Sequence, residues 1–207
     1  MNIKTIRMIM WATIAVLIAG VGLTTFGGFQ NTPGSNRLGT GLATIGGPFT
    51  LINTKGETVT QDDFNNKPLV VFFGYTFCPE VCPTTLFDMS QWIEALGDNA
   101  DKLHFALITV DPERDTPEVL AEYTSDFADG KIHGLGGSKE QIQAVIKAYR
   151  VYVRKVSEDG AADDDYIMDH TTTIYLMKKG GAFHGTIAYQ ENTNTAVEKL
   201  LRLAGIK

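Results

Sequence analysis

Two short, largely apolar runs constrain the fold of this chain more than any other feature. Residues 69–74 read LVVFFG and residues 103–110 read LHFALITV. Apolar runs of this length are typical of strands that are buried on both faces of a sheet. A segment with helical features follows each run, so the pattern predicts an α/β fold whose central sheet has helices on both sides.

The remaining elements are predicted from periodicity, turns and caps. Thr116 before Pro117 is expected to cap a helix over residues 117–127, and Ser138 with Gln141 predicts a capping box for a helix over residues 139–149. Apolar residues spaced by three and four predict a helix over residues 84–96. We also expect an N-terminal hairpin (49–52 with 57–60), a strand (151–156), a second hairpin (172–177 with 182–189) and a last helix (194–203).

The head of the chain contains 22 residues without a charged side chain, from Met8 to Phe29, after Lys4 and Arg7. As a helix this run would measure about 33 Å at roughly 1.5 Å per residue, which is enough to cross a bilayer core of about 30 Å. The basic residues before it predict a cytoplasmic N-terminus and an exported remainder. A cleaved signal peptide is the alternative, but its apolar core is usually shorter, so we favour a single uncleaved transmembrane helix.

These features predict a chain of three parts. Residues 1–29 are the cytoplasmic N-terminus and transmembrane anchor, residues 30–46 are a flexible linker rich in Gly, Thr, Asn, Pro and Ser, and residues 47–207 are one folded domain. The chain holds 24 acidic and 18 basic residues, and no dense basic patch follows the head. Nucleic acid is therefore not an expected partner.

The chain has only two cysteines, Cys78 and Cys82, and they lie between the first apolar run and the following helix. Two cysteines cannot build a disulfide scaffold, and a disulfide that closes so short a loop contributes little stability on the loop-entropy account. A structural disulfide, a redox pair and a metal site all stay open. Pro83 in the first helical turn would put Cys82 at or near the helix N-cap, where the helix dipole favours the thiolate.

A copper site with two thiolates would need one more ligand. His170 is a candidate, because it begins a strand after a long polar loop and stands beside Asp169, which could orient its ring. Met168 is a soft ligand but is more typical of core packing, and the acidic residues 158–165 are typical of a solvated loop. Three further histidines fit structural roles: His104 in a strand, His133 in a loop and His184 in a hairpin strand.

Three motifs together resemble the Sco/SenC family. They are FFGYTFCPEVCPTTL at residues 72–86, DPERDTP at residues 111–117, and DHT at residues 169–171 ahead of IYLM at residues 174–177. Glu80 stands where Asp is frequent in that family, and Thr171 stands where Ser is frequent, but neither change alters a candidate ligand. The resemblance covers nearly the whole exported domain and includes the N-terminal anchor.

The resemblance implies a thioredoxin-like fold and a membrane-anchored copper chaperone for cytochrome c oxidase assembly. It implies that Cys78 and Cys82 bind copper through sulfur and His170 through imidazole, and that Asp111 lies near the site and tunes it. The cargo would be Cu(I), and also Cu(II). The expected recipient is the oxidase subunit that holds the binuclear copper centre, and another copper chaperone or a thiol reductant is a further partner.

The implied location is the bacterial inner membrane, with the folded domain in the periplasm, or the equivalent mitochondrial inner membrane and intermembrane space. The same two cysteines also fit an enzyme, a thiol-disulfide reductase that keeps the cysteines of the oxidase copper site reduced. In that hypothesis Cys78 and Cys82 are catalytic, and His170 separates the two functions because a dithiol reductase does not need it. The CxxxC spacing weakens a simple thioredoxin-type oxidoreductase, for which CxxC is commoner. A copper or redox sensor is a third hypothesis that no residue specifically favours.

Overall fold

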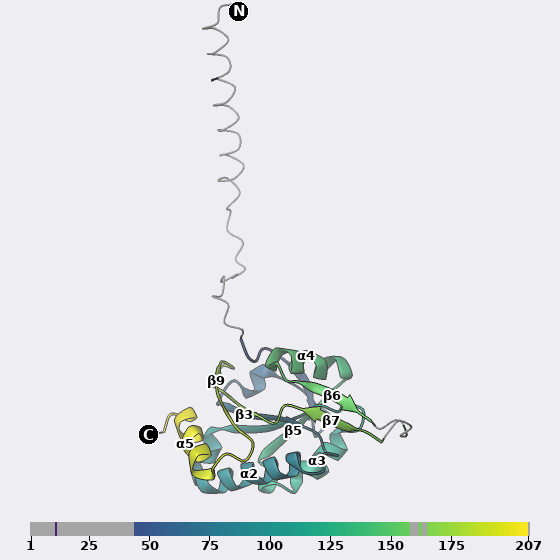
Figure 1. Ribbon diagram of the computed structural model, residues 1–207. Helices are drawn as coiled ribbons and strands as arrows, with labels where there is room; N and C mark the ends of the chain where they lie inside the picture. Colours follow the sequence, from purple (N-terminus) through teal and green to yellow (C-terminus); the bar gives the residue numbers. More distant parts are fainter. Residues whose placement is uncertain (1–10, 12–43, 158–161, 163–164, 207) are drawn as a thin grey trace, which may run out of the picture. The chain divides into compact units, whose positions relative to one another are not determined.

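The computed structural model describes residues 11, 44–157, 162 and 165–206 (Figure 1). The chain divides into two units, Met1–Leu42 and Ala43–Lys207, and we describe the second. The expected anchor, apart from Trp11, most of the expected linker and most of the acidic loop lie outside the described residues. Within the described ranges, no helix combines the length and the apolar character that crossing a membrane requires.

A seven-stranded mixed sheet forms the centre of the second unit (Figure 1). The middle strands β3, β4 and β5 run parallel, whereas β1, β2, β8 and β9 extend the sheet through antiparallel pairs. In spatial order the strands are β2 (Thr58–Thr60), β1 (Thr50–Asn53), β5 (Ile132–Gly136), β4 (His104–Thr109), β3 (Leu69–Gly74), β8 (Ile174–Met177) and β9 (Phe183–Ile187).

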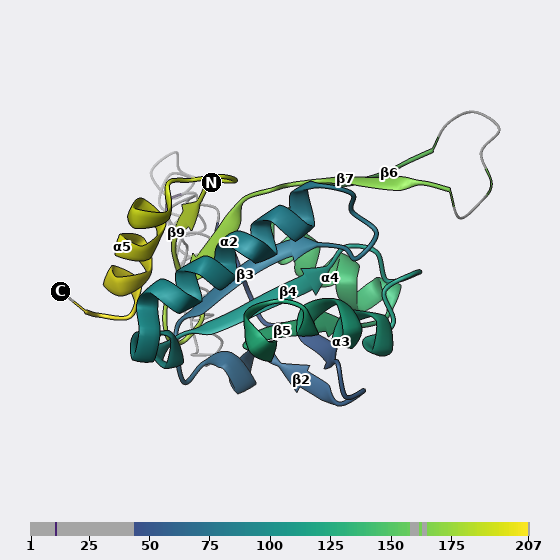
Figure 2. The ribbon, with the colours of Figure 1, turned by 90° about the horizontal axis from the view of Figure 1, so that it is seen from below.

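Helices cover both faces of this sheet, which explains why β3 and β4 are apolar almost throughout. Helices α2 (Val81–Leu96) and α3 (Pro117–Ser125) lie on one face and α4 (Lys139–Tyr149) on the other, as Figures 1 and 2 show from two directions. Helix α5 (Thr193–Leu203) contacts α2. Short 3-10 helices fill three connections: η1 (Gln61–Phe64), η2 (Gly97–Lys102) and η3 (Ala128–Gly130). The predicted α/β fold with a flanked central sheet is confirmed.

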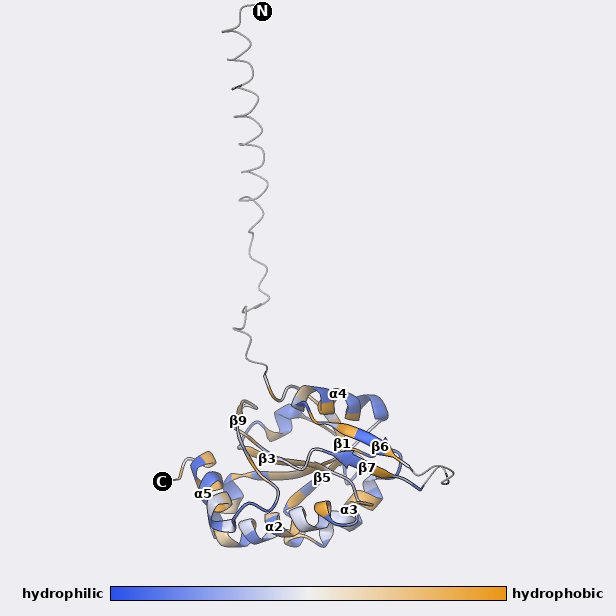
Figure 3. Cartoon of the chain, in the orientation of Figure 1, coloured by the Kyte–Doolittle hydropathy of each residue, from blue (hydrophilic) through white to orange (hydrophobic). Residues whose placement is uncertain are grey.

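The caps that the sequence predicts are present. The side chain of Thr116 accepts a hydrogen bond from the backbone of Val119, and Ser138 forms the full capping box with Gln141. Figure 3 shows apolar residues gathered along the central strands and polar residues on the outer face of α4. The apolar strand residues, buried from both sides, therefore form the hydrophobic core. Helices α3 and α4 begin at the residues whose side chains cap the first free backbone N–H groups.

Two further strands form a hairpin outside the main sheet. Strand β6 (Val153–Val156) pairs antiparallel with β7 (Ile167–His170). The sequence predicts β6, but β7 was not expected, and His170 ends this strand instead of beginning one. Strand pairing across the acidic loop explains the difference, because residues 153–156 supply a partner for residues 167–170.

Three other expectations need correction. Helix α2 begins at Val81, three residues earlier than predicted, so that the cysteine motif runs into the helix. His133 lies in strand β5, not in a loop, because β5 pairs with β4 on one side and β1 on the other. The end of the expected linker is attached to α4, since the Gly46 N–H donates to the Ala148 carbonyl at 2.9 Å.

Candidate metal centre

The loop between β3 and α2 is held in place by a buried carboxylate. Asp115 accepts hydrogen bonds from the Thr76 backbone at 3.2 Å and from the Thr76 hydroxyl at 2.6 Å. It also accepts one from the Thr109 hydroxyl, at the end of β4. Because Asp115 is 3% exposed, these bonds lie away from competing water. They fix the backbone two residues before Cys78.

The two cysteines have different environments. Neither forms a disulfide; Cys82 is fully buried, whereas Cys78 is partly exposed. Cys82 is the second residue of α2, past the N-cap residue Glu80, so it lies near the N-cap, as predicted. Its backbone N–H donates to Cys78 Sγ at 3.4 Å, which places the sulfur of Cys78, and not that of Cys82, at the positive end of the helix.

This arrangement makes Cys78 the thiolate. Hydrogen bonding from the Cys82 side chain lowers the pKa of Cys78 to about 4, with smaller contributions from His170 and the Cys82 backbone, against the opposing effect of burial. The pKa of Cys82 is raised, first by its hydrogen bond to the Cys78 sulfur and then by burial. The sequence-based expectation that Cys82 carries the stabilised thiolate is therefore wrong.

His170 reaches the cysteines from the β6–β7 hairpin. Its ring is 9% exposed and packs edge-on against Phe72 and Tyr75. Nδ1 hydrogen-bonds with the Thr171 carbonyl at 3.0 Å, and Nε2 lies 3.5 Å from Cys82 Sγ. Because a carbonyl oxygen only accepts, Nδ1 carries a proton, and Nε2 is the ring nitrogen that faces the sulfurs.

The ligand atoms of Cys78, Cys82 and His170 all lie within 4.8 Å of one another. Gly74 at the end of β3 makes room for this group, because a Cβ atom there would lie only 2.8 Å from Cys82 Sγ. A cavity of about 370 Å³ opens beside Cys78 and His170. Two soft sulfurs with one imidazole suit Cu(I), and also Zn(II). The structure thus brings together the three predicted ligands, and their binding of metal stays a prediction.

The other candidates are not part of this group. Asp169 forms an ion pair with Arg154 at 3.5 Å, so the Thr171 carbonyl, and not Asp169, orients the His170 ring. Met168 lines the cavity through which Cys78 and His170 are reached. The remaining histidines lie elsewhere in the main sheet: His104 in β4, His133 in β5 and His184 in β9.

Asp111 contacts Arg114 and Tyr166 and none of the three candidate ligands. It is 2% exposed and accepts hydrogen bonds from Arg114 Nε at 2.6 Å and from the Tyr166 hydroxyl at 2.9 Å. Asp111 is not one of the three candidate ligands, and its contacts hold Arg114 and Tyr166 in place beside them.

Arg114 is a functional candidate that sequence reasoning missed. Its guanidinium stacks at 3.6 Å from the ring centroid of Tyr166 and at 4.7 Å from that of Phe77, the residue before Cys78. Nη1 also donates to the Tyr166 carbonyl at 3.1 Å. Arg114 therefore connects the cysteine loop with the hairpin that carries His170. The sequence hint that Arg114 has a role is its position inside the acidic segment DPERD. Its partner Tyr166 lies 52 residues away, so this contact could not be predicted from the sequence.

Comparisons with known proteins agree with this geometry. A protein-family model described as SCO1/SenC matches residues 39–205. Protein SenC from Rhodobacter capsulatus is 44% identical over 143 residues, which cover 68% of this chain and 63% of SenC. The structure of Bradyrhizobium japonicum ScoI with copper bound superposes with a TM-score of 0.71 at 45% identity, covering 77% of this chain and 99% of that one.

More distant relatives share the fold. BsSco is described as a member of the Sco family of cytochrome c oxidase assembly proteins in which a disulfide switch was identified. It superposes with a TM-score of 0.60 at 21% identity, covering 80% of this chain and 96% of that one. The chain spans only part of several curated relatives, such as 40% of SCO1 homolog 1 from Arabidopsis thaliana and 53% of SCO2 from Saccharomyces cerevisiae.

Proposed function

Because this chain belongs to the SCO1/SenC family, we propose that it carries copper as cargo between Cys78, Cys82 and His170. The observation that supports this most is the convergence of two sulfurs and one imidazole nitrogen within 4.8 Å of one another. The copper in the structure of ScoI, which is 45% identical, supports the identity of the metal. Two thiolates and one imidazole favour Cu(I) over harder ions.

Copper binding requires the reduced cysteine pair. Cys78 is already a thiolate at neutral pH, because its pKa is lowered to about 4. Cys82 holds its proton, because the neighbouring thiolate and burial raise its pKa, and it releases that proton when a metal ion replaces it. Copper loading is therefore accompanied by loss of a proton, and oxidation to a disulfide abolishes it.

We further propose delivery to the binuclear copper centre of a cytochrome c oxidase subunit. The Sco family is one of cytochrome c oxidase assembly proteins, which supports this class of recipient. The uncharged run of residues 8–29 supports attachment to the membrane that holds the oxidase. Relatives in bacteria and in mitochondria support the periplasmic side of the inner membrane, or its mitochondrial equivalent. Partly exposed Cys78 is the ligand that a recipient reaches first.

Removing His170 tests the copper site. We expect His170→Ala to lower Cu(I) affinity by more than about tenfold, since even residues that only support a ligand contribute about 10–100-fold. The measurement is competition with a Cu(I) chelator under reducing conditions. His184→Ala, an exposed histidine in β9, is the matched control and should bind like the wild type. Equal affinity in wild type and His170→Ala would show that imidazole is not a ligand.

The arrangement of the two thiols also favours a second function, thiol-disulfide reduction. The Cys78 thiolate would attack one sulfur of a target disulfide, forming a mixed disulfide and releasing the first target thiolate. Cys82, after losing its proton, would attack Cys78 Sγ and release the second target thiolate. Two electrons pass to the target, and Cys78 and Cys82 end as a disulfide. A partly exposed thiolate beside a buried thiol fits this order of attack.

Trapping distinguishes the two functions. With a disulfide-bonded peptide, Cys82→Ser should accumulate the mixed disulfide at Cys78, whereas Cys78→Ser should not. His170→Ala should retain this reaction if reduction is a separate function. Failure of Cys82→Ser to trap any peptide would remove the reductase hypothesis and leave the copper hypothesis standing.

A further inference from the structure

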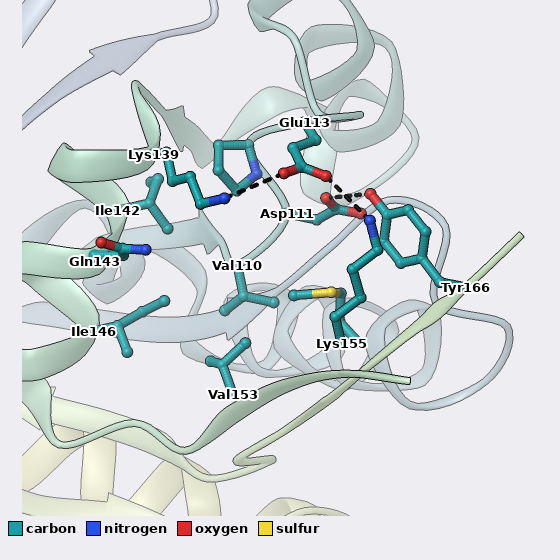
Figure 4. Close-up of a pocket in the computed structure, with 12 residues that line it drawn as sticks. Val110, Asp111, Glu113, Lys139, Ile142, Gln143, Ile146, Val153, Lys155 and Tyr166 are labelled. Atoms are coloured by element: carbon teal, nitrogen blue, oxygen red, sulfur yellow. Dashed lines mark hydrogen bonds and ion pairs between the residues drawn. The ribbon is translucent and has the colours of Figure 1, made fainter. Parts of the chain in front are cut away.

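A second cavity shares the β6–β7 hairpin with the candidate metal centre. It measures about 270 Å³ and lies between α4, the segment after β4 and the hairpin (Figure 4). Met168 lines both cavities. The walls of the second cavity are mainly apolar and include Val110, Ile142, Ile146 and Val153.

One end of this cavity carries a carboxylate held between two ammonium groups. Glu113 Oε1 lies 3.5 Å from Lys139 Nζ, and Glu113 Oε2 lies 3.2 Å from Lys155 Nζ (Figure 4). The Lys155 ammonium also lies 3.5 Å from the ring centroid of Tyr166. The two lysines come from different elements, α4 and β6, so the fold places them on either side of one carboxylate.

Glu113 is free to give way to another carboxylate. Its side chain is 52% exposed, and exposed ion pairs are weak because water competes with them. Among the described residues its carboxylate pairs with the ammonium groups of Lys139 and Lys155, whose side chains are 64% and 45% exposed. Its position shows the geometry in which these two ammonium groups bind a carboxylate.

We propose that this cavity binds a small organic carboxylate with an apolar body. The ligand carboxylate replaces that of Glu113 between Lys139 and Lys155, and the apolar body covers Ile142 and Ile146. The volume is near the lower end of small-molecule sites, which start at about 300 Å³, so a short chain fits.

The cavity also holds the carboxylates of Asp111 and Glu113, but these already pair with Arg114 and with the two lysines, so a cationic ligand has no unpaired carboxylate to bind. An uncharged ligand would form no ion pair with Lys139 and Lys155. The site does not depend on the proposed copper function.

Methyl NMR of the full-length protein tests the proposal, with hexanoate as the probe. We expect saturable shifts of the Ile142 and Ile146 methyl signals, while the buried methyls of Ile174 and Ile187 in β8 and β9 stay unchanged. Hexanol and hexylammonium should bind at least about fivefold more weakly, because they lack the carboxylate. Absence of saturable shifts, or equal binding of hexanol, would overturn the proposal.

The direction in which Glu113→Gln changes hexanoate affinity is a second test. Glu113→Gln removes the competing charge and should strengthen hexanoate binding, whereas the double variant Lys139→Gln with Lys155→Gln should weaken it by about fivefold. The matched control replaces Lys178 and Lys179, on the turn between β8 and β9, and should leave binding unchanged. Weaker hexanoate binding by Glu113→Gln would show that the carboxylate does not sit between the two lysines.

Discussion

Among single residues, Gly74 leaves space for the sulfur of Cys82 because it has no side chain. A Cβ atom on this residue would lie 2.7 Å from Phe72 Cε1 and 2.8 Å from Cys82 Sγ, closer than real Cβ contacts allow. The requirement for glycine comes from the close approach of α2 to β3. The apolar run therefore ends in glycine because the sulfur of Cys82 occupies the position that a side chain would take.

Gly74→Ala should therefore displace Cys82. We expect the variant to lose about 1–3 kcal/mol of unfolding free energy through overpacking, and to bind Cu(I) more weakly than the wild type. Denaturant unfolding and chelator competition measure the two effects. Gly185→Ala in β9 is the matched control, because nothing lies within 4 Å of a Cβ there. A variant at position 74 that behaves like this control would show that the space beside Cys82 is not needed.

The thiolate of Cys78 depends on its partner cysteine. The rate of Cys78 alkylation against pH should have its midpoint near the pKa of about 4 in the wild type. In Cys82→Ala the largest cause of the lowered pKa is gone, so the midpoint should move to higher pH. Cys82→Ser keeps a hydroxyl donor and should retain part of the lowering. Identical profiles for the alanine variant and the wild type would contradict this origin of the low pKa.

At the scale of elements, the β6–β7 hairpin is the part that brings His170 to the cysteines. Within the described residues its strands pair with each other and not with the main sheet. The hairpin is joined to the rest by the Tyr75 hydroxyl, which accepts from the Met168 N–H at 3.1 Å, and by Arg114 at Tyr166. These side-chain contacts, and not sheet hydrogen bonds, determine where His170 lies.

Arg114→Leu should loosen the hairpin and weaken Cu(I) binding. The substitution leaves the carboxylate of Asp111 buried without its ion pair, which costs about 3–5 kcal/mol of unfolding free energy. Hydrogen exchange in β7 should become faster, as measured by mass spectrometry. Arg154→Leu, which breaks the exposed ion pair with Asp169, is the control and should cost less than about 1 kcal/mol. Unchanged β7 exchange in Arg114→Leu would mean that other contacts hold the hairpin.

At the scale of the whole molecule, the two ends of the parallel strands have different roles. The carboxyl ends of β3 and β4 carry the cysteine loop and the segment of Asp111, Arg114 and Asp115, as is common for ligand sites in open α/β sheets. The opposite end holds His104 and His133, whose rings pack edge-on at 5.7 Å. Burial lowers the pKa of both, to about 4 for His104.

These histidines should make the fold acid-sensitive. In the unfolded chain a histidine takes up a proton below about pH 6.5, whereas folded His104 stays neutral down to about pH 4. The unfolded state therefore binds more protons in this window, and the unfolding free energy falls as the pH falls from about 6.5 to about 4. Chemical denaturation at several pH values should show a shallower decline for His104→Gln than for the wild type. His184→Gln is the exposed control, and an equal slope in all three proteins would contradict the assignment.

Several elements follow from local signals in the amino-acid sequence. The apolar runs predicted β3 and β4, and the residues around Thr116 and Ser138 predicted where α3 and α4 begin, because burial periodicity and capping depend on neighbours along the chain. Residue type and position made the two cysteines and His170 candidates, and the resemblance to a family implied that they are copper ligands.

Other features depend on contacts between residues that are distant in the sequence. Strand β5 reads IHGLG and has little strand signal of its own, and it is a strand because β4 and β1 supply hydrogen-bond partners on both sides. His170 meets Cys82 across 88 residues, and Asp115 reaches Thr76 across 39. No local pattern encodes such contacts, because chain packing alone brings these side chains together.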